Sequence, residues 1–419
     1  MENIKNNTEN ILDMYHNLLP VIKENITADT TKLIFKKEKI SQSDIFSQNQ
    51  DAFNFAVEQI FLRQKFKHKF PTLTKNFDFI FHSRLNCEQA SSEYTAEYKA
   101  NILTNYKTSI DLTGGLGVDS LAFAKKAQAH YYLEVNENLC SYFEKNVNNL
   151  EIENIKIINC SAEDFFATNQ NNLTKFDIIY LDPDRRKNNK RFFLLEDLQP
   201  NLLELQNVFF KHGKNILIKL SPLFDITKTE KELKNIAEIH IVSVENECKE
   251  LLVLINENAE NIKYFAVNLI KDEENKIIQN IVKFEKNQES KISYNMPQKY
   301  IYEPNSSLMK LAFWSDLADK YNLEKLHKNS HLFTANHLIK SFYGRKFEVI
   351  AIENFNKKEV LKHIGNDKKA NVTVRNFPYS TQEIYKKLGL KEGGNIYIFA
   401  TTTIDDKLKI LITTKINED

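Results

Sequence analysis

Residues 110–120, IDLTGGLGVDS, constrain the fold more than any other stretch of the chain. An apolar residue and an acid, Asp111, precede three glycines, Gly114, Gly115 and Gly117. A helical pattern of apolar residues begins directly afterwards, at Val118. A strand end, a glycine turn and a helix start bring backbone N–H groups close to a ligand. The stretch therefore predicts a β-to-α unit with a ligand site at its turn, although a plain structural turn has the same pattern.

Two later strand patterns also end in acids. The run YYL is followed by Glu134, and the run FDIIYL is followed by Asp182 and Pro183. Proline cannot continue a central strand, so the chain should turn at this pair. Ligands of open α/β sheets bind outside the carboxyl ends of the strands. We therefore expect Asp111, Glu134 and Asp182 to line one edge of one sheet.

The glycine turn suits two kinds of cofactor. The dinucleotide fingerprint G-x-G-x-x-G/A is matched only loosely, by Gly115, Gly117 and Ser120. NAD would also bring a pyrophosphate, which Asp111 would repel. S-adenosylmethionine instead carries a cationic ammonium and a cationic sulfonium. The acid before the glycines therefore favours S-adenosylmethionine over NAD.

Residues 100–256 resemble the class I S-adenosylmethionine-dependent methyltransferases. Alternating strand and helix patterns indicate a mostly parallel, Rossmann-like α/β sheet. The glycine signature of these enzymes normally has a glycine where this chain has Thr113. Some nucleic-acid-modifying subfamilies share that departure.

Composition excludes some classes of protein. The chain has 419 residues and a net charge of +1, so a contact with nucleic acid needs a local basic patch. Its four cysteines are scattered, which favours reduced thiols over a zinc site. No apolar run approaches the roughly 18 residues of a membrane span. We expect a cytoplasmic protein with neither a metal nor a membrane partner.

The pattern divides the chain into four parts. Residues 1–99 form an N-terminal helical region, with apolar spacing of three and four over residues 12–91. The cofactor-binding domain spans 100–258, and a ferredoxin-like linking module spans 259–339. Within that module a helix that opens in the segment YEPNSS should run to Tyr321. Residues 340–419 form a small α+β module with fifteen Lys and Arg against ten Asp and Glu, a local net of +5 (15 − 10).

The whole chain adds a more specific resemblance. In order it carries DLTGGLGVDS, LDPDRR, ECKELL, YEPNSS, YGRKF and VRNFPYS. This order resembles a family of bacterial class I methyltransferases that have a ferredoxin-like insert and a C-terminal THUMP-like domain. THUMP domains of other enzymes bind RNA, so the resemblance implies tRNA or rRNA as the partner.

The resemblance also implies site residues. The cofactor-binding positions are Asp111, Thr113, Gly114, Gly115, Gly117, Glu134, Asp182 and the adenine turn Ser161, Ala162 and Glu163. Ser161, Glu163 and Asp164 remain alternatives for the direct adenine contact. Asp182 and Pro183 would be catalytic, and Arg185 and Arg186 would bind substrate. Lys219, at the end of a later strand, is expected to be a solvated or paired charge.

Asp182 and Pro183 suit transfer of a methyl group to an exocyclic amine. The lone pair of such an amine is delocalised into the base. Groups that accept hydrogen bonds from the amine N–H groups localise the lone pair on the nitrogen, where it can attack the methyl group. The aromatic residue that follows this motif in amino-methylating enzymes is missing, and an arginine plane could replace it. The glycine turn, with Thr113, Gly115 and Gly117, also resembles the first motif of an rRNA guanine-N2 methyltransferase family. We therefore expect an RNA base methyltransferase, and this resemblance favours guanine N2. The alternatives are a methyltransferase that acts on a small molecule or protein, and a binding module with an inactive cofactor fold.

Overall fold

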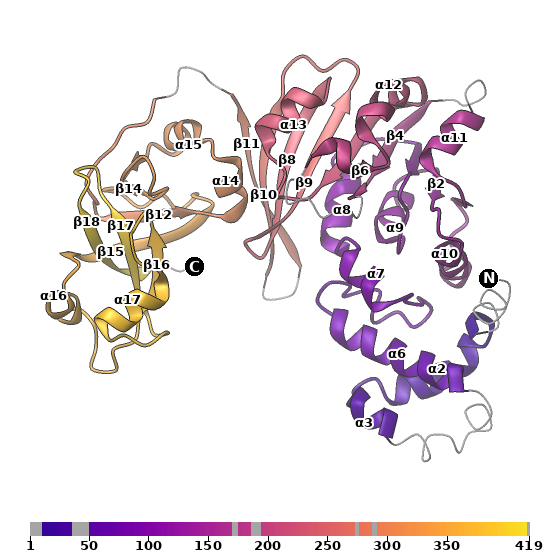
Figure 1. Cartoon of the computed structure of the whole chain (residues 1–419), viewed down its shortest axis with the longest axis horizontal. Coiled ribbons are helices and arrows are strands. Elements are labelled where there is room, and N and C mark those ends of the chain that lie inside the picture. The colour runs from indigo at the N-terminus through magenta and orange to yellow at the C-terminus, as the bar shows by residue number, and fades with distance from the viewer. Residues whose placement is uncertain are drawn as a thin grey trace. The chain divides into compact units, whose positions relative to one another are not determined.

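The computed structural model describes residues 11–35, 50–169, 175–185, 194–272, 276–286 and 291–416. It divides into two compact units. The first contains Met1–Ala237 and Leu252–Glu260, and the second contains Glu238–Leu251 and Asn261–Asp419. Figure 1 labels the elements of both units.

The N-terminal part of the first unit is helical. Its helices are α2 (Tyr15–Glu24), α3 (Thr30–Phe35), α6 (Gln50–Phe66), α7 (Arg84–Gln89) and α8 (Glu93–Asn101). On α2 the spacing of three and four places Tyr15, Leu18 and Ile22 on one buried stripe. This stripe packs against the apolar face of α6, including Phe53 and Ile60. The described part of this region follows the expected helical pattern except at one long turn.

That exception spans residues 67–83, which form turns instead of helix. The side chain of Arg63, on α6, is only 2% exposed and organises this segment. Its guanidinium donates hydrogen bonds to the carbonyl oxygens of Leu73, Thr74, Asn76 and Phe79. Backbone carbonyls that a helix would pair internally are therefore satisfied by one buried side chain.

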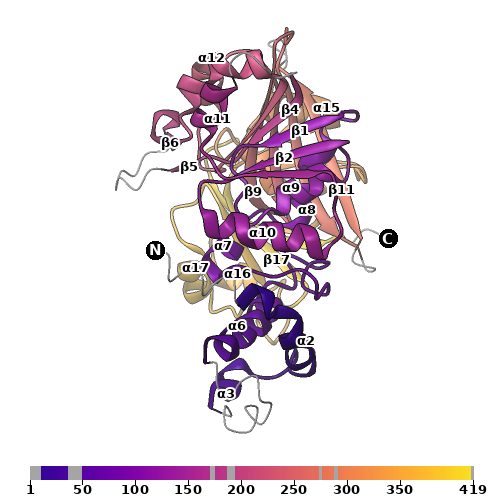
Figure 2. The ribbon, with the colours of Figure 1, turned by 90° about the vertical axis from the view of Figure 1, so that its right-hand side faces the viewer.

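The sheet of the first unit has the strand order β9-β7-β4-β1-β2-β3. The pairs of β1 with β2 and β4, of β2 with β3, and of β4 with β7 are all parallel. The strands are β1 (Thr108–Asp111), β2 (Ala129–Leu133), β3 (Ile155–Ile158), β4 (Phe176–Leu181), β7 (Gly213–Leu220) and β9 (Glu247–Asn256), of which β9 is divided between the units. The order reverses between β1 and β4, so this point is the topological switch of the sheet. Figure 2 shows β4, β1 and β2 side by side.

Helices connect these parallel strands. They are α9 (Val118–Ala124), α10 (Glu137–Asn149), α11 (Ala162–Thr168), α12 (Leu202–His212) and α13 (Ile226–Glu232). The connection after β4 also contains a short hairpin of β5 (Asp184–Arg185) and β6 (Leu198–Gln199), with a 3₁₀ turn at Leu195–Asp197. Helices α9 and α10 contact β1, β2 and β3. Their apolar faces form one core with Phe79 and Phe81 of the N-terminal region.

The second unit begins with strands in the order β11-β10-β8-β9. The strands β8 (Ile236–Val244) and β10 (Lys263–Lys271) are parallel, and β10 forms an antiparallel hairpin with β11 (Ile277–Glu285). The single helix expected to end at Tyr321 is instead two helices, α14 (Ser306–Leu311) and α15 (Trp314–Tyr321). Ala312 has a φ of 58°, and this left-handed residue ends α14.

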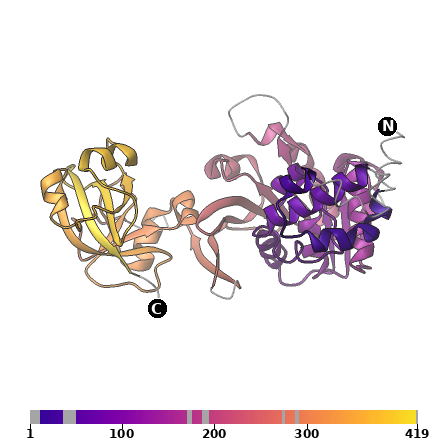
Figure 3. The ribbon, with the colours of Figure 1, turned by 90° about the horizontal axis from the view of Figure 1, so that it is seen from below.

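A seven-stranded sheet completes the second unit, in the order β13-β14-β12-β15-β18-β17-β16. Its strands are β12 (Tyr300–Pro304), β13 (Glu324–Lys325), β14 (Phe333–Ala335), β15 (Gly344–Asn354), β16 (Asn371–Arg375), β17 (Ile396–Thr402) and β18 (Leu408–Lys415). Two helices, α16 (Lys357–Leu361) and α17 (Thr381–Leu388), lie against it (Figure 3). Ile398 belongs to the core under these helices, and the next residue, Phe399, belongs to the core of the other face. This alternation is the period of two that a strand between two apolar layers requires.

In the part of the chain that the structure describes, no helix combines the length and the apolar character needed to cross a membrane.

Candidate active site at the carboxyl edge of the sheet

The glycine turn is held to the two strands beside β1. The N–H of Leu112 donates to the carbonyl of Tyr180 on β4, and the N–H of Gly114 donates to that of Leu133 on β2, at 2.9 and 2.7 Å. Gly117 has a φ of 83°, and a Cβ there would lie 2.1 Å from the Phe143 ring. The turn therefore lies directly on buried rings, which explains why glycines are needed.

Asp111 ends β1 and is only 1% exposed. One carboxylate oxygen accepts the N–H of Thr113 at 3.0 Å, and the other accepts the hydroxyl of Ser120 at 2.7 Å. Burial and the nearby charge of Asp119 raise the pKa of Asp111 to about 7. Asp111 thus joins β1 to the first turn of α9 and makes the potential at the turn sensitive to pH near neutrality.

Asp182 follows β4, on the other side of the switch point. Its N–H donates to the hydroxyl oxygen of Thr113 at 2.7 Å, and its carboxylate forms an ion pair with the ammonium of Lys219 at the end of β7. The Asp182 side chain remains 33% exposed. Burial raises its pKa, and Lys219 opposes that rise. Thr113 therefore holds the backbone of Asp182 and Lys219 holds its carboxylate, while part of the side-chain surface stays open.

Glu134 follows β2 and is half-buried. Its two carboxylate oxygens accept the backbone N–H groups of Gly115 at 2.9 Å and Asn136 at 2.8 Å. Tyr132 holds the same turn, because its hydroxyl donates to the carbonyl of Gly115 at 2.7 Å. The structure therefore brings Asp111, Glu134 and Asp182 to the carboxyl ends of neighbouring strands.

Below this edge lies a buried ion pair between α8 and α9. The ammonium of Lys99 lies 2.9 Å from a carboxylate oxygen of Asp119, and the Lys99 side chain is fully buried. The other oxygen of Asp119 accepts the hydroxyls of Ser91 at 2.7 Å and Tyr180 at 3.0 Å. Burial pushes the pKa of Asp119 upward, but Lys99 and Lys219 lower it below its ordinary value. Asp119 is consequently the ionised centre of the network.

The turn after β3 begins α11. Ser161 caps this helix, since its hydroxyl oxygen accepts the N–H of Asp164 at 3.0 Å, and Ala162 is buried. A carboxylate oxygen of Glu163 accepts the side-chain amide of Gln199 on β6 at 3.2 Å. The proposed adenine turn therefore has its side chains engaged in capping and in contact with the β5–β6 hairpin.

The proposed substrate residues lie just after β4. Pro183 is buried, and the backbone of Arg185 pairs with Leu198 in the β5–β6 hairpin. Arg186 lies outside the described residues.

Sequence reasoning missed two roles and found a third only in part. Lys99 and Asp119 were not selected, because a single lysine in a helix is normally solvated. The available signal was weak: Lys99 stands between Tyr98 and Ala100, which are both buried. Lys219 was expected to be solvated or paired, and it is paired, with Asp182.

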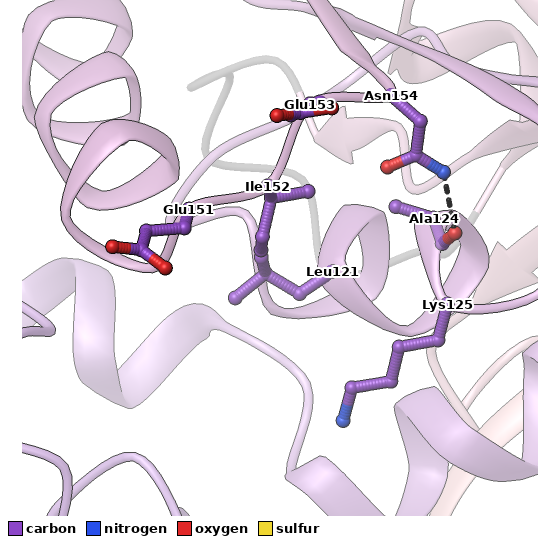
Figure 4. Close-up of a pocket in the computed structure, with 7 residues that line it drawn as sticks. All are labelled: Leu121, Ala124, Lys125, Glu151, Ile152, Glu153 and Asn154. Carbon is purple, nitrogen blue, oxygen red and sulfur yellow. Dashed lines mark hydrogen bonds between the residues drawn. The ribbon is translucent and has the colours of Figure 1, made fainter.

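A cavity of about 410 Å³ lies elsewhere in the first unit (Figure 4). Leu121 and Ala124 of α9 line it, together with residues 151–154 that precede β3. The side-chain amide of Asn154 donates to the carbonyl of Ala124 at 2.8 Å and closes one wall. This hollow opens where β3 starts, so it belongs to the opposite end of the strands from Asp111. In the described ranges, no three His, Cys, Asp or Glu side chains are grouped to hold a metal ion.

A parallel sheet with a glycine turn after β1, an acid after β2 and an Asp-Pro turn after β4 defines the class I methyltransferase fold. Comparison with known proteins agrees over consecutive segments. Residues 97–231 match the family described as conserved hypothetical protein 95, residues 300–342 match a ferredoxin-like domain, and residues 344–415 match a THUMP-like domain.

Two individual proteins extend the comparison. The crystal structure of a candidate methyltransferase from Porphyromonas gingivalis W83 is 28% identical, covers 98% of this chain and 99% of its own, and has a TM-score of 0.84. An uncharacterized RNA methyltransferase of Fusobacterium nucleatum is 26% identical over 176 residues, which are 40% of this chain and 38% of that protein. The chain thus spans well under half of this curated relative. Along the chain, the segment similar to conserved hypothetical protein 95 is followed by the segments similar to a ferredoxin-like and a THUMP-like domain.

Proposed function

We propose that this protein transfers a methyl group from S-adenosylmethionine to an exocyclic amine of an RNA base, with guanine N2 as the first candidate. The observation that carries the proposal is the arrangement of Asp111, Glu134 and Asp182 around a glycine turn at the switch point of the sheet. Carboxylates at this edge suit a cationic donor and would repel a pyrophosphate. The similarity to an RNA methyltransferase and to THUMP-like domains supports RNA as the substrate.

The residues fit the cofactor in a specific way. Glu134 has both carboxylate oxygens at the turn, and each keeps capacity to accept a ribose hydroxyl beyond its one backbone N–H. A Cβ at Gly115 would meet only the carbonyl of Thr113, at 3.8 Å, so its backbone is open to close approach. Asp111 is buried and would act on the methionyl ammonium and the sulfonium through its negative field. When bound, S-adenosylmethionine supplies an electrophilic methyl group on a sulfonium.

Asp182 and Pro183 supply the acceptor side. The carboxylate of Asp182 and the carbonyl of Pro183 accept hydrogen bonds from the two amine N–H groups, which localises the nitrogen lone pair toward the methyl group. As the N–C bond forms, the bond from sulfur to the methyl carbon breaks, and the one proton that the amine loses passes to the Asp182 carboxylate or to solvent. The bond to Thr113 fixes the backbone of Asp182, and the pair with Lys219 orients its carboxylate. Such orientation matters because methyl transfer needs an aligned approach at about 3 Å. Arg185 and Arg186 are proposed to grip the substrate backbone or stack on its base.

We also propose that the chain divides into four parts with separate roles. Residues 1–99 form the helical region, 100–258 bind the cofactor, 259–339 link the domains, and 340–419 dock the RNA. Limited proteolysis followed by mass spectrometry would test these boundaries. Stable fragments whose ends fall inside β1–β7 would contradict them.

The activity is tested with tritium-labelled S-adenosylmethionine. The purified protein is incubated with RNA, protein and metabolite fractions from a strain that lacks the gene. Label should enter RNA, and nuclease digests should contain N2-methylguanosine. Label confined to protein or metabolites would instead establish the alternative substrate class.

A variant separates chemistry from binding. Asp182→Asn keeps the size and the contact with Thr113, so calorimetric affinity for S-adenosylhomocysteine should change by less than about tenfold while transfer falls by about 10²-fold or more. Failure of the native protein to bind S-adenosylhomocysteine at all would refute the proposed activity.

A further inference from the structure

A second hollow, with many polar side chains in its lining, lies entirely within the second unit. It has a volume of about 960 Å³, near the upper end of the roughly 300–1,000 Å³ of ligand sites. Its walls come from β10, β11, the loop before β15, the start of β15 and the end of β18. We call it the β10–β15 groove. Its lining includes none of the acids Asp111, Glu134 and Asp182, and the proposed chemistry does not use it.

The charge of the groove is one-sided. Four cationic side chains line it, namely Lys340, Arg345, Lys346 and Lys415, and the described lining contains neither Asp nor Glu. Lys340 and Lys415 are exposed. Lys346 is only 4% exposed and donates to the carbonyl of Lys340 at 3.0 Å, so it fixes the loop that presents Lys340. A groove with this charge attracts an anion, and its cations are spread along the lining strands and loop.

One nearby carboxylate does not cancel this charge. Glu303 is buried behind Arg345, and it pairs with both Arg345 and Arg375. One negative charge is thus shared by two guanidinium groups, which leaves a local excess of one positive charge. Arg345 is held rigidly by this contact, as a preformed anion site requires.

Amides and a phenol line the remaining wall. The carboxamide oxygen of Asn268 accepts the N–H of Asn246 at 3.0 Å, and its NH₂ group makes no hydrogen bond to another described residue. The Asn280 side chain also makes none in that part of the chain, and Tyr343 supplies an aromatic ring. Amides can donate to and accept from base edges, and aromatic rings stack on unpaired bases. An acidic peptide has no nucleobase to stack on the ring of Tyr343.

We propose that the β10–β15 groove binds a single-stranded segment of the RNA substrate, with phosphates on Lys340 and Lys415 and bases toward Asn268, Asn280 and Tyr343. This inference rests on the proposed function for the identity of the polyanion, and on the groove itself for its location. The groove serves to dock the RNA, in addition to the contacts at Asp182.

The test compares two double variants that remove equal charge from the same unit. Lys340→Gln/Lys415→Gln alters the groove, and Lys320→Gln/Lys328→Gln alters two exposed lysines outside its lining and outside residues 340–419. Binding of a labelled single-stranded RNA of about 16 nucleotides is measured by fluorescence anisotropy over a range of salt. Each lost phosphate contact should flatten the slope of log K against log[salt] by about 0.7. The groove variant should therefore lose about 1.4 in slope and about 20-fold in affinity at about 0.1 M salt, and the control should lose neither.

Further arms decide the remaining outcomes. Lys340→Arg/Lys415→Arg should retain the native affinity, which excludes damage to the fold as the cause. Equal losses in groove and control variants, or unchanged binding in both, would overturn the proposal. Displacement of the RNA by polyglutamate as effective as that by unlabelled RNA would assign the groove to an acidic protein instead. Titration of each variant with S-adenosylhomocysteine keeps the two proposals separate. A protein that binds RNA in the groove but does not bind S-adenosylhomocysteine would refute the proposed activity and leave the groove proposal standing.

Discussion

The N–H of Asp182 donates a hydrogen bond to the hydroxyl oxygen of Thr113 at 2.7 Å, across the switch point between β4 and β1. Thr113 stands where the methyltransferase signature has a glycine. Its hydroxyl also lies 3.4 Å from Asp111 and donates to that carboxylate. The departure from the signature therefore adds a link that a glycine could not make, between the end of β1 and the proposed catalytic turn.

Thr113→Val removes this link while keeping the shape of the side chain. Loss of the acceptor for a half-buried N–H should cost about 1 kcal/mol of the free energy of unfolding. Methyl transfer should fall more than the affinity for S-adenosylhomocysteine, because the orientation of Asp182 is loosened. Urea unfolding and single-turnover transfer measure the two effects. Thr113→Ser retains the hydroxyl and serves as control, and equal behaviour of the two variants would contradict this role.

Lys99→Met tests the buried ion pair. The change leaves the carboxylate of Asp119 buried without its closest cation, which should destabilise the protein by about 3–5 kcal/mol. Lys99→Met/Asp119→Asn removes both charges and should be more stable than Lys99→Met alone. Thermal unfolding of the two single variants and the double variant completes the cycle. Additive losses would show that the two side chains do not depend on each other.

Asp111→Asn should change stability in a pH-dependent way. Because the folded-state pKa of Asp111 is about 7, against an ordinary value of 3.8, the folded protein keeps a proton that the unfolded chain releases. Stability is therefore lost as pH rises from about 4 to 7, by on the order of 4 kcal/mol in total. The variant does not titrate there.

Urea unfolding at pH 5 and pH 8 compares the two proteins. The stability of Asp111→Asn relative to the native protein should be higher at pH 8 than at pH 5. Its affinity for S-adenosylhomocysteine, which lacks the sulfonium but retains the ammonium, should be weaker. A stability difference that is the same at both pH values would show that Asp111 does not titrate in this window.

Gly115→Ala and Gly117→Ala form a matched pair in the turn. Gly115 has a φ of 54° and open space for a Cβ, so alanine should cost only the left-handed strain of about 1–2 kcal/mol. Gly117 has a φ of 83°, and a Cβ there would lie 2.1 Å from the Phe143 ring. Alanine at this position should therefore cost about 1–3 kcal/mol through overpacking, in addition to the left-handed strain. Calorimetric unfolding measures both. Similar transition temperatures would show that the ring moves aside without strain.

Local pattern was sufficient for much of the architecture. The helix after the glycine turn, the strands that end before Glu134 and Asp182, and the α+β character of the last module follow from apolar spacing and turn residues. The pattern was insufficient at Ala312, where it runs on while the backbone turns left-handed. It also failed over residues 67–83. There the Arg63 side chain bonds carbonyls of residues that are distant in sequence, and apolar spacing carries no signal for such contacts.

The amino-acid sequence alone determined which residues end the strands, since turns and strand ends are local properties of glycine, proline and acidic residues. It thereby placed Asp111, Glu134 and Asp182 at one edge. Only the tertiary structure decided their partners: Thr113 and Lys219 for Asp182, Ser120 for Asp111, and Lys99 for Asp119. The reason is that the strength and the pKa of a buried charge depend on groups that are distant in sequence and meet only when the chain folds.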